Sequence, residues 1–160
     1  MPHPILKQIA RDLVPDDRGM ILRVVTDLVD TMRSHARCAG LAAPQIGELV
    51  RVIVVDASRH PKGESVNGLV ALANPVLVRA SGDEVGREGC LSVPDLTANV
   101  RRATEIIVEG TSPGDESRVV EARGFEARCF LHELDHLDGI VILDRVESLA
   151  ADVFARRRYA

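Results

Sequence analysis

The sequence predicts an α+β fold in one domain. The strand-like segments lie in the middle of the chain, between an early amphipathic helix and a late helix that contains two histidines. Strands and helices do not alternate one by one, as they do in parallel α/β sheets, so separate helical and sheet regions are expected. A length of 160 residues is typical of a single domain with a sizeable core, and we expect one domain over residues 1–160.

The first helix is expected to begin at Asp16 or Asp17 and to continue to about Arg37. Aspartate is a good N-cap, and the apolar residues that follow recur at spacings of three and four. These apolar residues are Ile21, Val24, Val25, Leu28 and Met32. A turn-forming segment is expected over residues 40–47, and the β-branched run over residues 50–56 predicts a buried strand.

The middle of the chain is expected to form strands that are separated by polar turns. Residues 57–68 are rich in Ser, Pro, Gly, Lys and Asn, which predicts a loop. The sequence SPGD at residues 112–115 predicts a turn. Strands are expected near residues 69–73, 75–80, 98–109 and 118–123.

Two helices are expected in the last part of the chain. The helix with the histidines should extend from about Phe125 to Asp138, because Gly139 is well placed to end it. A short amphipathic helix is expected over Ser148 to Arg157. The predicted fold therefore has an N-terminal helix, a group of strands, a histidine-bearing helix and a short C-terminal helix.

The composition excludes several classes of function. The net charge of −4 provides no basic surface for nucleic acid, and one Tyr, three Phe and no Trp provide no stacking platform for bases. No apolar run approaches the roughly 20 residues of a membrane helix, and the N-terminus MPHP lacks the features of a signal peptide. Three cysteines without disulfide-like spacing indicate a reducing compartment. We therefore expect a cytoplasmic protein without a nucleic-acid or membrane partner.

Residues 131–139 read LHELDHLDG and contain the most informative pattern of the chain. On a helix, residues four apart lie on one face, so His132 and His136 can reach a single metal ion. Glu133 lies one position round the helix, where it is close to the metal and free to act as a general base. This H-E-x-x-H arrangement is typical of metal hydrolases. The alternative interpretation is an exposed charged helix with incidental histidines.

A third ligand is needed, because a catalytic zinc-type site uses three protein ligands and leaves one position for water. A zincin protease would take this ligand from downstream of the helix, where there is no histidine and Glu147 lies eleven residues past the second one. Upstream, Cys90 lies in the segment EGCLSVP at residues 88–94. A small buried apolar residue is the alternative interpretation of this cysteine. Cys38 and Cys129 compete with it for the role.

Three segments resemble the signature motifs of the peptide deformylases, in the family's order: GLAAPQ at residues 40–45, EGCLS at 88–92 and HELDH at 132–136. The spacing is also similar, and the resemblance covers about residues 20–145. It implies an α+β fold with β-sheets packed around a central metal-binding helix, which agrees with the predicted order of elements. It also implies that Cys90 is a thiolate ligand beside His132 and His136.

The resemblance implies an enzyme that removes the formyl group from the N-terminal methionine of newly made bacterial and organellar proteins. A divalent metal would lower the pKa of its bound water, which becomes the nucleophile. Glu133 would take the proton of that water and pass it to the departing amine. The Gln45 side-chain amide and the Leu91 backbone N–H would donate hydrogen bonds to the former formyl oxygen. A turn residue that bonds its own loop is the alternative interpretation of Gln45.

The family's mode of substrate binding would resemble strand addition. The Gly40 carbonyl would accept the amide N–H of the substrate, and Gly89 belongs to the same substrate-binding set. The positions that resemble the wall of the methionine pocket are Phe125, Arg128 and Cys129. Glu88 would accept a hydrogen bond from a ligand histidine, with an ordinary surface salt bridge as the alternative.

The metal and the partners also follow from the resemblance. One thiolate and two imidazoles alone would suggest zinc. The family instead points to Fe²⁺ as the native ion, with Zn²⁺, Ni²⁺ or Co²⁺ able to replace it. N-formylmethionyl nascent peptides are the expected partners. The basic run at residues 156–158 suggests a ribosome contact, with a solvated helix end as the alternative.

Several positions depart from the family pattern. Cys38 stands where a glycine is usual, and it could narrow the pocket, be oxidised or simply pack. Arg128 stands where an apolar residue is usual; we expect its stem to lie along the pocket with its head in water, or the residue to change what enters. Thr97 stands roughly where an arginine is frequent. Asp135 is expected to pair with a nearby arginine such as Arg102.

Two other functions are compatible with the same ligands. A different metalloamidase or peptidase would cleave internal peptide bonds and leave formyl peptides intact. A catalytically silent paralogue would bind N-terminal peptides or metal without releasing formate. The intact Glu133 and Gln45 favour the active enzyme over the silent one.

Overall fold

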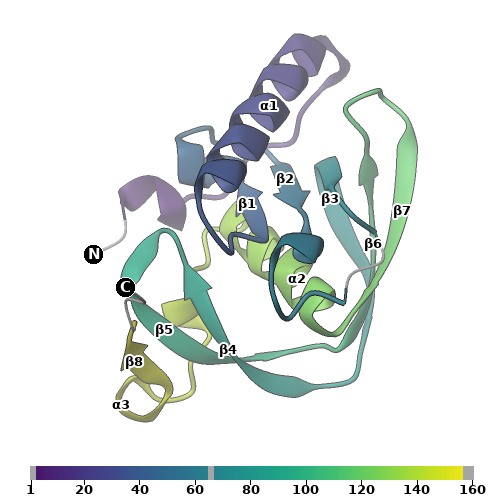
Figure 1. The fold of residues 1–160 in the computed structure, drawn as a ribbon. Coiled ribbons are helices and arrows are strands. Elements are labelled where there is room, and N and C mark those ends of the chain that lie inside the picture. Colours follow the sequence, from purple (N-terminus) through teal and green to yellow (C-terminus); the bar gives the residue numbers. More distant parts are fainter. Residues whose placement is uncertain (1–2, 65–66, 157–160) are drawn as a thin grey trace.

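The computed structural model describes residues 3–64 and 67–156, and Figure 1 shows its elements. A five-stranded antiparallel sheet has the order β1-β2-β3-β6-β7, and a three-stranded antiparallel sheet has the order β4-β5-β8. The larger sheet consists of β1 (Gly40–Ala42), β2 (Val52–Val55), β3 (Val70–Ser81), β6 (Glu105–Thr111) and β7 (Ser117–Arg123). The smaller sheet consists of β4 (Glu84–Cys90), β5 (Val93–Arg102) and β8 (Val153–Ala155).

The described residues also form helices of two kinds. The α-helices are α1 (Arg18–Ser34), α2 (Gly124–Leu137) and α3 (Leu149–Asp152). The short 3₁₀ turns are η1 (Pro4–Lys7), η2 (Pro15–Asp17), η3 (Ala43–Ile46), η4 (Ala57–Arg59) and η5 (Ile142–Asp144). The predicted α+β class is confirmed. No helix in the described part of the chain is both long and apolar enough to cross a membrane.

The strand β2 lies between two helices, which explains why its β-branched run is buried throughout. Side chains alternate between the two faces of a strand. Val52 and Val54 pack with residues of α1, whereas Ile53 and Val55 pack with residues of α2. The two helices therefore cover opposite faces of this part of the larger sheet.

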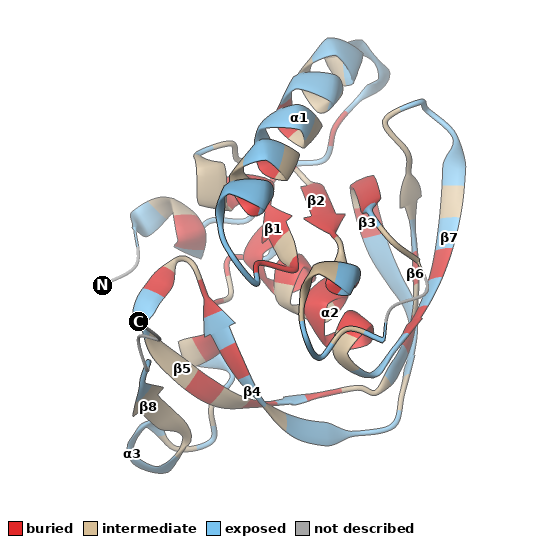
Figure 2. Ribbon diagram, viewed as in Figure 1, coloured by how far each residue is buried: buried red, intermediate tan, exposed pale blue. Residues whose placement is uncertain are grey.

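Helix α2 is the centre of the molecule. It lies between the larger sheet and the hairpin of β4 and β5 (Figure 1), and ten of its fourteen residues are buried, as the red ribbon in Figure 2 shows. Its buried residues include polar ones, among them Glu126, Arg128 and Glu133. Because buried polar groups are costly unless they are paired or used, this helix is where a functional site is expected.

The hairpin of β4 and β5 brings one of the predicted ligands toward α2. Gly89 pairs with Thr97, but the next residue, Cys90, pairs with Val93. The residues between these two partners on β5 form an irregular bulge, and bulges bend a strand and redirect its side chains. Cys90 ends the strand almost fully buried, at 3% exposure.

Some predicted elements differ from the observed ones. The segment 69–80 is one strand with register shifts, and the segment 98–109 is divided between β5 and β6. The predicted turn over 40–47 includes β1, and the first helix ends at Ser34. Strand β4 was not predicted, because its sequence EVGREGC has two glycines and little apolar alternation.

The prediction of a helix over Ser148–Arg157 is wrong for most of its length. Only residues 149–152 are helical, and the next three form β8. Phe154 pairs with Thr97 of β5, so the hydrogen bonds of this strand come from a distant part of the chain. Local periodicity cannot reveal such pairing.

Candidate metal centre

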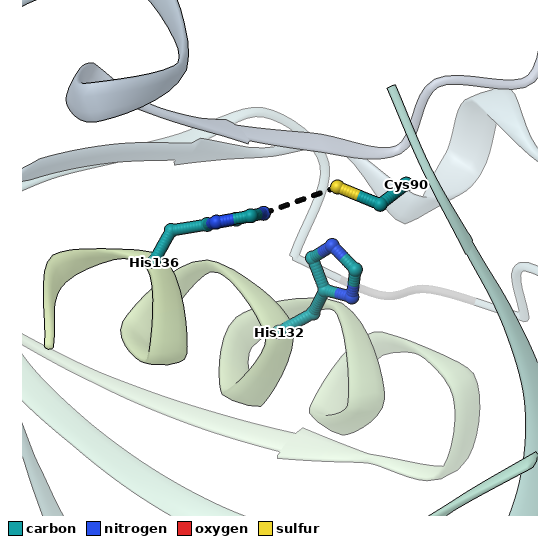
Figure 3. A group of neighbouring side chains, drawn as sticks. All are labelled: Cys90, His132 and His136. Atoms are coloured by element: carbon teal, nitrogen blue, oxygen red, sulfur yellow. Dashed lines mark hydrogen bonds between the residues drawn. The ribbon is translucent and has the colours of Figure 1, made fainter. Parts of the chain in front are cut away.

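Cys90, His132 and His136 converge at the inner face of α2 (Figure 3). One ligand atom from each residue lies within 4.8 Å of the other two. The Cys90 Sγ and His136 Nε2 atoms are 3.2 Å apart, and the two imidazole rings are 5.0 Å apart between centroids, at 73°. Among the described residues, this is the group that can hold a metal ion; Cys38 and Cys129 do not belong to it.

The chemistry of these donors fits a divalent transition metal. A thiolate and two imidazoles form a three-ligand site that leaves a position for water. Burial, followed by the charges of His132 and Arg102, lowers the pKa of His136 to about 3, so this ring is neutral. Burial would also lower the pKa of His132, but the hydrogen bonds to Cys90 and Glu88 raise it, so an ion would bind there by displacing a proton. In addition, the Glu133 Oε2 atom is buried beside this group without a hydrogen-bond partner. A buried carboxylate oxygen of this kind needs a partner, which a water molecule at the metal would provide.

Glu88 holds the His132 ring in place, through its Oε2 atom at 2.9 Å from His132 Nδ1. The carboxylate also accepts hydrogen bonds from Arg102, at 2.9 and 3.1 Å, and from Arg128 at 2.9 Å. Burial alone would raise the pKa of Glu88, but the bonds from His132 and Arg102 outweigh it and hold the pKa at about 2. Glu88 is only 6% exposed, so the alternative of an ordinary surface salt bridge does not describe it.

A buried ion cluster extends from Glu88 along α2 to Asp135, which lies on the same face of the helix as Arg128 and His132. The Arg102 guanidinium forms ion pairs with both Glu88 and Asp135. The expected pairing of Asp135 with Arg102 is therefore confirmed. Asp135 also accepts hydrogen bonds from Arg145, at 2.6 and 3.0 Å. Every charge in this cluster therefore has an opposite charge beside it, which is the condition for burying ions at a tolerable cost.

Glu133 lies against the first strand of the larger sheet. A Cβ atom on Gly40 would lie 2.7 Å from Glu133 Oε1, so the absence of a side chain at position 40 makes room for this carboxylate. Glu133 is 4% exposed, and its burial raises its pKa to about 7, against the opposing charge of His132.

Gln45 and Leu91 lie beside the ligand group. The Gln45 Oε1 atom accepts a hydrogen bond from the Ala42 backbone N–H at 2.9 Å, so this residue does bond its own loop. Its Nε2 atom donates to Ser92 Oγ at 3.1 Å and lies 3.6 Å from Cys90 Sγ. Leu91 occupies the turn directly after Cys90. One amide group therefore serves both the loop and the site.

A cavity of about 1100 Å³ opens over this centre. It is lined by His132, Glu133, Gln45 and Leu91. The residues that the sequence predicts to bind substrate also line it, namely Gly40, Gly89, Phe125, Arg128 and Cys129. Residues 153–156 form a further part of the wall that the sequence analysis missed, because the strand β8 was not recognised.

The expectation that the head of Arg128 lies in water is wrong. Its guanidinium donates to Glu88, to the Val100 carbonyl at 2.8 Å and to the Glu84 carbonyl at 2.9 Å. The guanidinium lies against Gly86 of the β4–β5 hairpin, where a Cβ atom on Gly86 would lie 2.7 Å from Arg128 Cζ. A buried carboxylate and two carbonyls are stronger attractions for this guanidinium than the solvent at the cavity mouth.

Cys38 packs beside the site as a protonated thiol. Its Sγ atom donates to the Gly40 carbonyl at 3.2 Å. Burial, with a smaller contribution from the charge of Glu133, raises the pKa of Cys38 to about 11. Of the outcomes expected for this position, packing agrees best with these contacts.

The fold and this centre together define a metal hydrolase with one thiolate ligand, two imidazole ligands and a buried glutamate beside them. A model of the polypeptide deformylase family matches residues 1–152, and the chain belongs to that family.

Individual relatives agree with this assignment. The peptide deformylase of Thermodesulfovibrio yellowstonii is 35% identical over 156 residues, which cover 98% of this chain and 92% of that protein. The peptide deformylase of Desulforudis audaxviator is 44% identical over 150 residues, 92% of this chain and 91% of that protein. Among solved structures, the Thermus thermophilus peptide deformylase superposes with a TM-score of 0.80 at 40% identity, over 91% of this chain and 82% of that one. The Met-Ala-Ser complex of the Acinetobacter baumannii peptide deformylase superposes with a TM-score of 0.80 at 33% identity, over 90% of this chain and 93% of that one.

Proposed function

We propose that this chain is an active peptide deformylase, which hydrolyses the formamide bond of N-formylmethionine at the N-terminus of newly made proteins and releases formate. The observation that carries the proposal is the convergence of Cys90, His132 and His136 with the unpartnered carboxylate of Glu133 in one cavity. Membership of the polypeptide deformylase family supports it. We further propose that residues 1–160 form a single catalytic domain and that the protein acts in the cytoplasm, where nascent chains are made.

The three ligands would hold one divalent ion, which activates water and polarises the formyl oxygen when it is bound. We propose Fe²⁺ as the native ion, on the resemblance to the family, with Zn²⁺, Ni²⁺ or Co²⁺ as substitutes. The thiolate and imidazole donors suit all four ions. Glu88 would act through His132, because it fixes the orientation of that ring.

Glu133 would move the proton that the reaction transfers. Its Oε2 atom has no competing hydrogen bond, so it is available to take a proton from the attacking water. The same carboxylate would then deliver the proton to the methionine nitrogen as the bond to the formyl carbon breaks. Gly40 keeps the space in which this carboxylate lies.

Gln45 and Leu91 would stabilise the negative charge that develops on the formyl oxygen. The Gln45 amide is anchored by Ala42, and its Nε2 atom lies 3.6 Å from Cys90 Sγ while it also donates to Ser92 Oγ. The Leu91 backbone N–H would be the second donor. Donors fixed in advance are effective because they need no reorganisation during the reaction.

The peptide would add to the free edge of β1. Asp56 N donates to the Ala39 carbonyl at 2.8 Å, so the next carbonyl, that of Gly40, points away from β2. It would accept the amide N–H of the substrate, as strand addition requires, with Gly89 on the other side. Phe125, Cys129 and the stem of Arg128 would surround the methionine side chain. The peptide complex of the Acinetobacter baumannii relative supports a peptide ligand for this cavity.

The test is an assay of formate release from formyl-Met-Ala-Ser, with anaerobically iron-loaded protein and again with zinc. The Glu133→Ala variant is expected to keep its metal and to lose nearly all turnover, because it removes the buried carboxylate oxygen that has no hydrogen-bond partner at the centre. Normal turnover in this variant would remove Glu133 from the mechanism. Cleavage of internal peptide bonds alone would select the peptidase alternative, and tight peptide binding without formate would select the silent paralogue.

A ribosome contact by residues 156–158 stays a prediction. Arg157 and Arg158 lie outside the described residues, whereas Arg156 lines the cavity. Removal of residues 155–160 should reduce cosedimentation with ribosomes if the contact exists, and unchanged cosedimentation would contradict it.

A further inference from the structure

Among residues 3–64 and 67–156, the exposed charges that line the cavity have the same sign. These residues are Arg37, Lys62, Arg87 and Arg156. The acidic residues that line it in this part of the chain are Glu88 and Glu133, which are only 6% and 4% exposed. The chain as a whole has a net charge of −4, so the basic mouth is opposite in sign to the rest of the molecule.

Arg156 is held at the rim next to the ligand-bearing turn. Its backbone N–H donates to the Asp95 carbonyl at 2.8 Å, which continues the attachment of β8 to β5. Its Nη1 atom donates to the carbonyls of Cys90 and Pro94, at 3.3 and 3.4 Å. Its Nη2 atom lies over Gly89, where a Cβ atom would be only 2.7 Å away.

The Arg156 guanidinium keeps part of its donor capacity. A guanidinium has five N–H donors, and the two carbonyls contact Nη1 alone. No carboxylate within 3–64 or 67–156 forms an ion pair with it. The residue is exposed at the cavity mouth, where a bound peptide would leave the site.

The cavity lining includes further basic groups. His60 stacks on Phe125 with ring centroids 4.5 Å apart, and both residues line the cavity. Arg37 and Lys62 line the same cavity, and their charges, after burial, lower the pKa of His60. A peptide that leaves the methionine pocket would therefore pass several cations.

We propose that this basic mouth selects formylmethionyl peptides with carboxylate side chains in the first residues after methionine, and that Arg156 is a positioning residue for them. The inference rests on the proposed deformylase function. Guanidinium groups bind carboxylates in a paired geometry, and a one-signed rim also raises the local concentration of acidic chains. Exposed ion pairs are individually weak, so the selection is several-fold and falls with salt.

A carboxylate on a short peptide has two sources, namely a side chain and the C-terminus of the peptide itself. Peptides with a C-terminal amide remove the second source. The substrates are therefore formyl-Met-Ala-Asp-amide, its Asn counterpart of nearly equal size and its Lys counterpart, each also made with a free C-terminus as a comparison.

The experiment measures kcat and KM for these amides with the wild-type enzyme and three variants. Arg156→Gln removes the charge, Arg156→Lys keeps it, and Arg79→Gln is a matched loss of charge at an exposed residue of β3 that does not line the cavity. We expect the wild type to have a lower KM for the Asp amide than for the Asn amide. Arg156→Gln should lose about threefold in kcat/KM on the Asp amide and should not change on the Asn amide. Arg156→Lys should retain part of the preference, and Arg79→Gln all of it. High salt should reduce the preference in the wild type.

Each other outcome has a distinct meaning. Equal kcat/KM for the Asp, Asn and Lys amides in the wild type would overturn the proposal while the deformylase function stands. An equal loss of kcat on all three amides in Arg156→Gln would show a structural role at the Cys90 turn and overturn the role of Arg156. A preference seen only with free C-termini would assign the mouth to terminal carboxylates and overturn the side-chain proposal. No formate from any peptide would contradict the proposed function instead.

Discussion

At the scale of single residues, Gly40 joins two tasks that the sequence presents as separate. Its carbonyl is directed away from β2, where we propose that it accepts the substrate amide N–H, and its missing side chain makes room for Glu133. From the sequence we expected only the first task. The second could not be foreseen, because it depends on the packing of α2 against β1.

Gly40→Ala is expected to displace the Glu133 carboxylate, since the new Cβ would lie 2.7 Å from Oε1 in a buried site with little space. Turnover of formyl-Met-Ala-Ser should fall by at least about tenfold, because a misplaced base costs proton transfer. Metal content, measured by atomic absorption, should stay the same. Gly19→Ala is the control: nothing lies within 4 Å of its Cβ, and turnover should not change. Wild-type turnover in Gly40→Ala would show that the carboxylate has room to adjust.

A second residue-scale prediction concerns the reactivity of Cys38. Burial raises the pKa of this thiol to about 11, so almost none of it is thiolate at neutral pH. Alkylation by iodoacetamide should therefore be about a hundredfold slower than for an exposed thiol at pH 7.5. The rate should rise as the pH approaches 11. Mass spectrometry of the Cys38 peptide from metal-loaded protein gives the rate, and fast labelling at neutral pH would contradict the prediction.

At the scale of elements, the buried ion cluster connects β4, β5 and α2 through Glu88, Arg102 and Asp135. Arg102→Met removes the guanidinium that pairs with both Glu88 and Asp135 and leaves two buried carboxylates short of a partner. The free energy of unfolding should fall by about 3–5 kcal/mol.

The neighbouring Arg101 provides a matched control. Its partners, Asp83 and Glu147, are exposed, so Arg101→Met should change stability by less than about 1 kcal/mol. Urea unfolding followed by circular dichroism compares the two variants. If both variants lost a similar free energy of unfolding, the burial of the Arg102 cluster would not explain its contribution to stability.

Elements with a strong local signal were predicted, and elements defined by distant partners were not. The spacing of apolar residues indicated α1, and the β-branched run indicated β2, because each pattern matches a face that is buried. Strand β4 has a weak pattern, and β8 forms only because β5 offers a free edge. The two histidines and Glu133 follow from their spacing on a predicted helix, whereas Cys90 on β4 was identified through the resemblance to the family. Arg156 at the cavity and the buried head of Arg128 depend on contacts between distant segments, and the sequence did not reveal them.

At the scale of the whole molecule, the metal ligands connect the two sheets. Cys90 belongs to the smaller sheet, whereas His132 and His136 lie on the helix that packs against the larger one. A bound ion would therefore stabilise the folded chain by mass action and would hold the hairpin against α2.

Removal of the metal with a chelator should lower the melting temperature and loosen the hairpin selectively. Hydrogen exchange should increase most in peptides from β4 and β5, and least in α1 and β2, which have a core of their own. Mass spectrometry of the exchanged protein, with and without metal, measures this. A uniform increase in hydrogen exchange over all elements would mean that the ion stabilises the whole fold equally and does not hold the hairpin selectively.

The position of β8 has a consequence for biosynthesis. Because a chain is made from its N-terminus, the ligand histidines of α2 are synthesised before the strand that brings Arg156 to the cavity. The segments that form the five-stranded sheet and α2 have been synthesised by then, whereas one wall of the cavity needs β8 to pair with β5. In the order of translation, the segment that forms the wall beside Cys90 is therefore made after all three metal ligands.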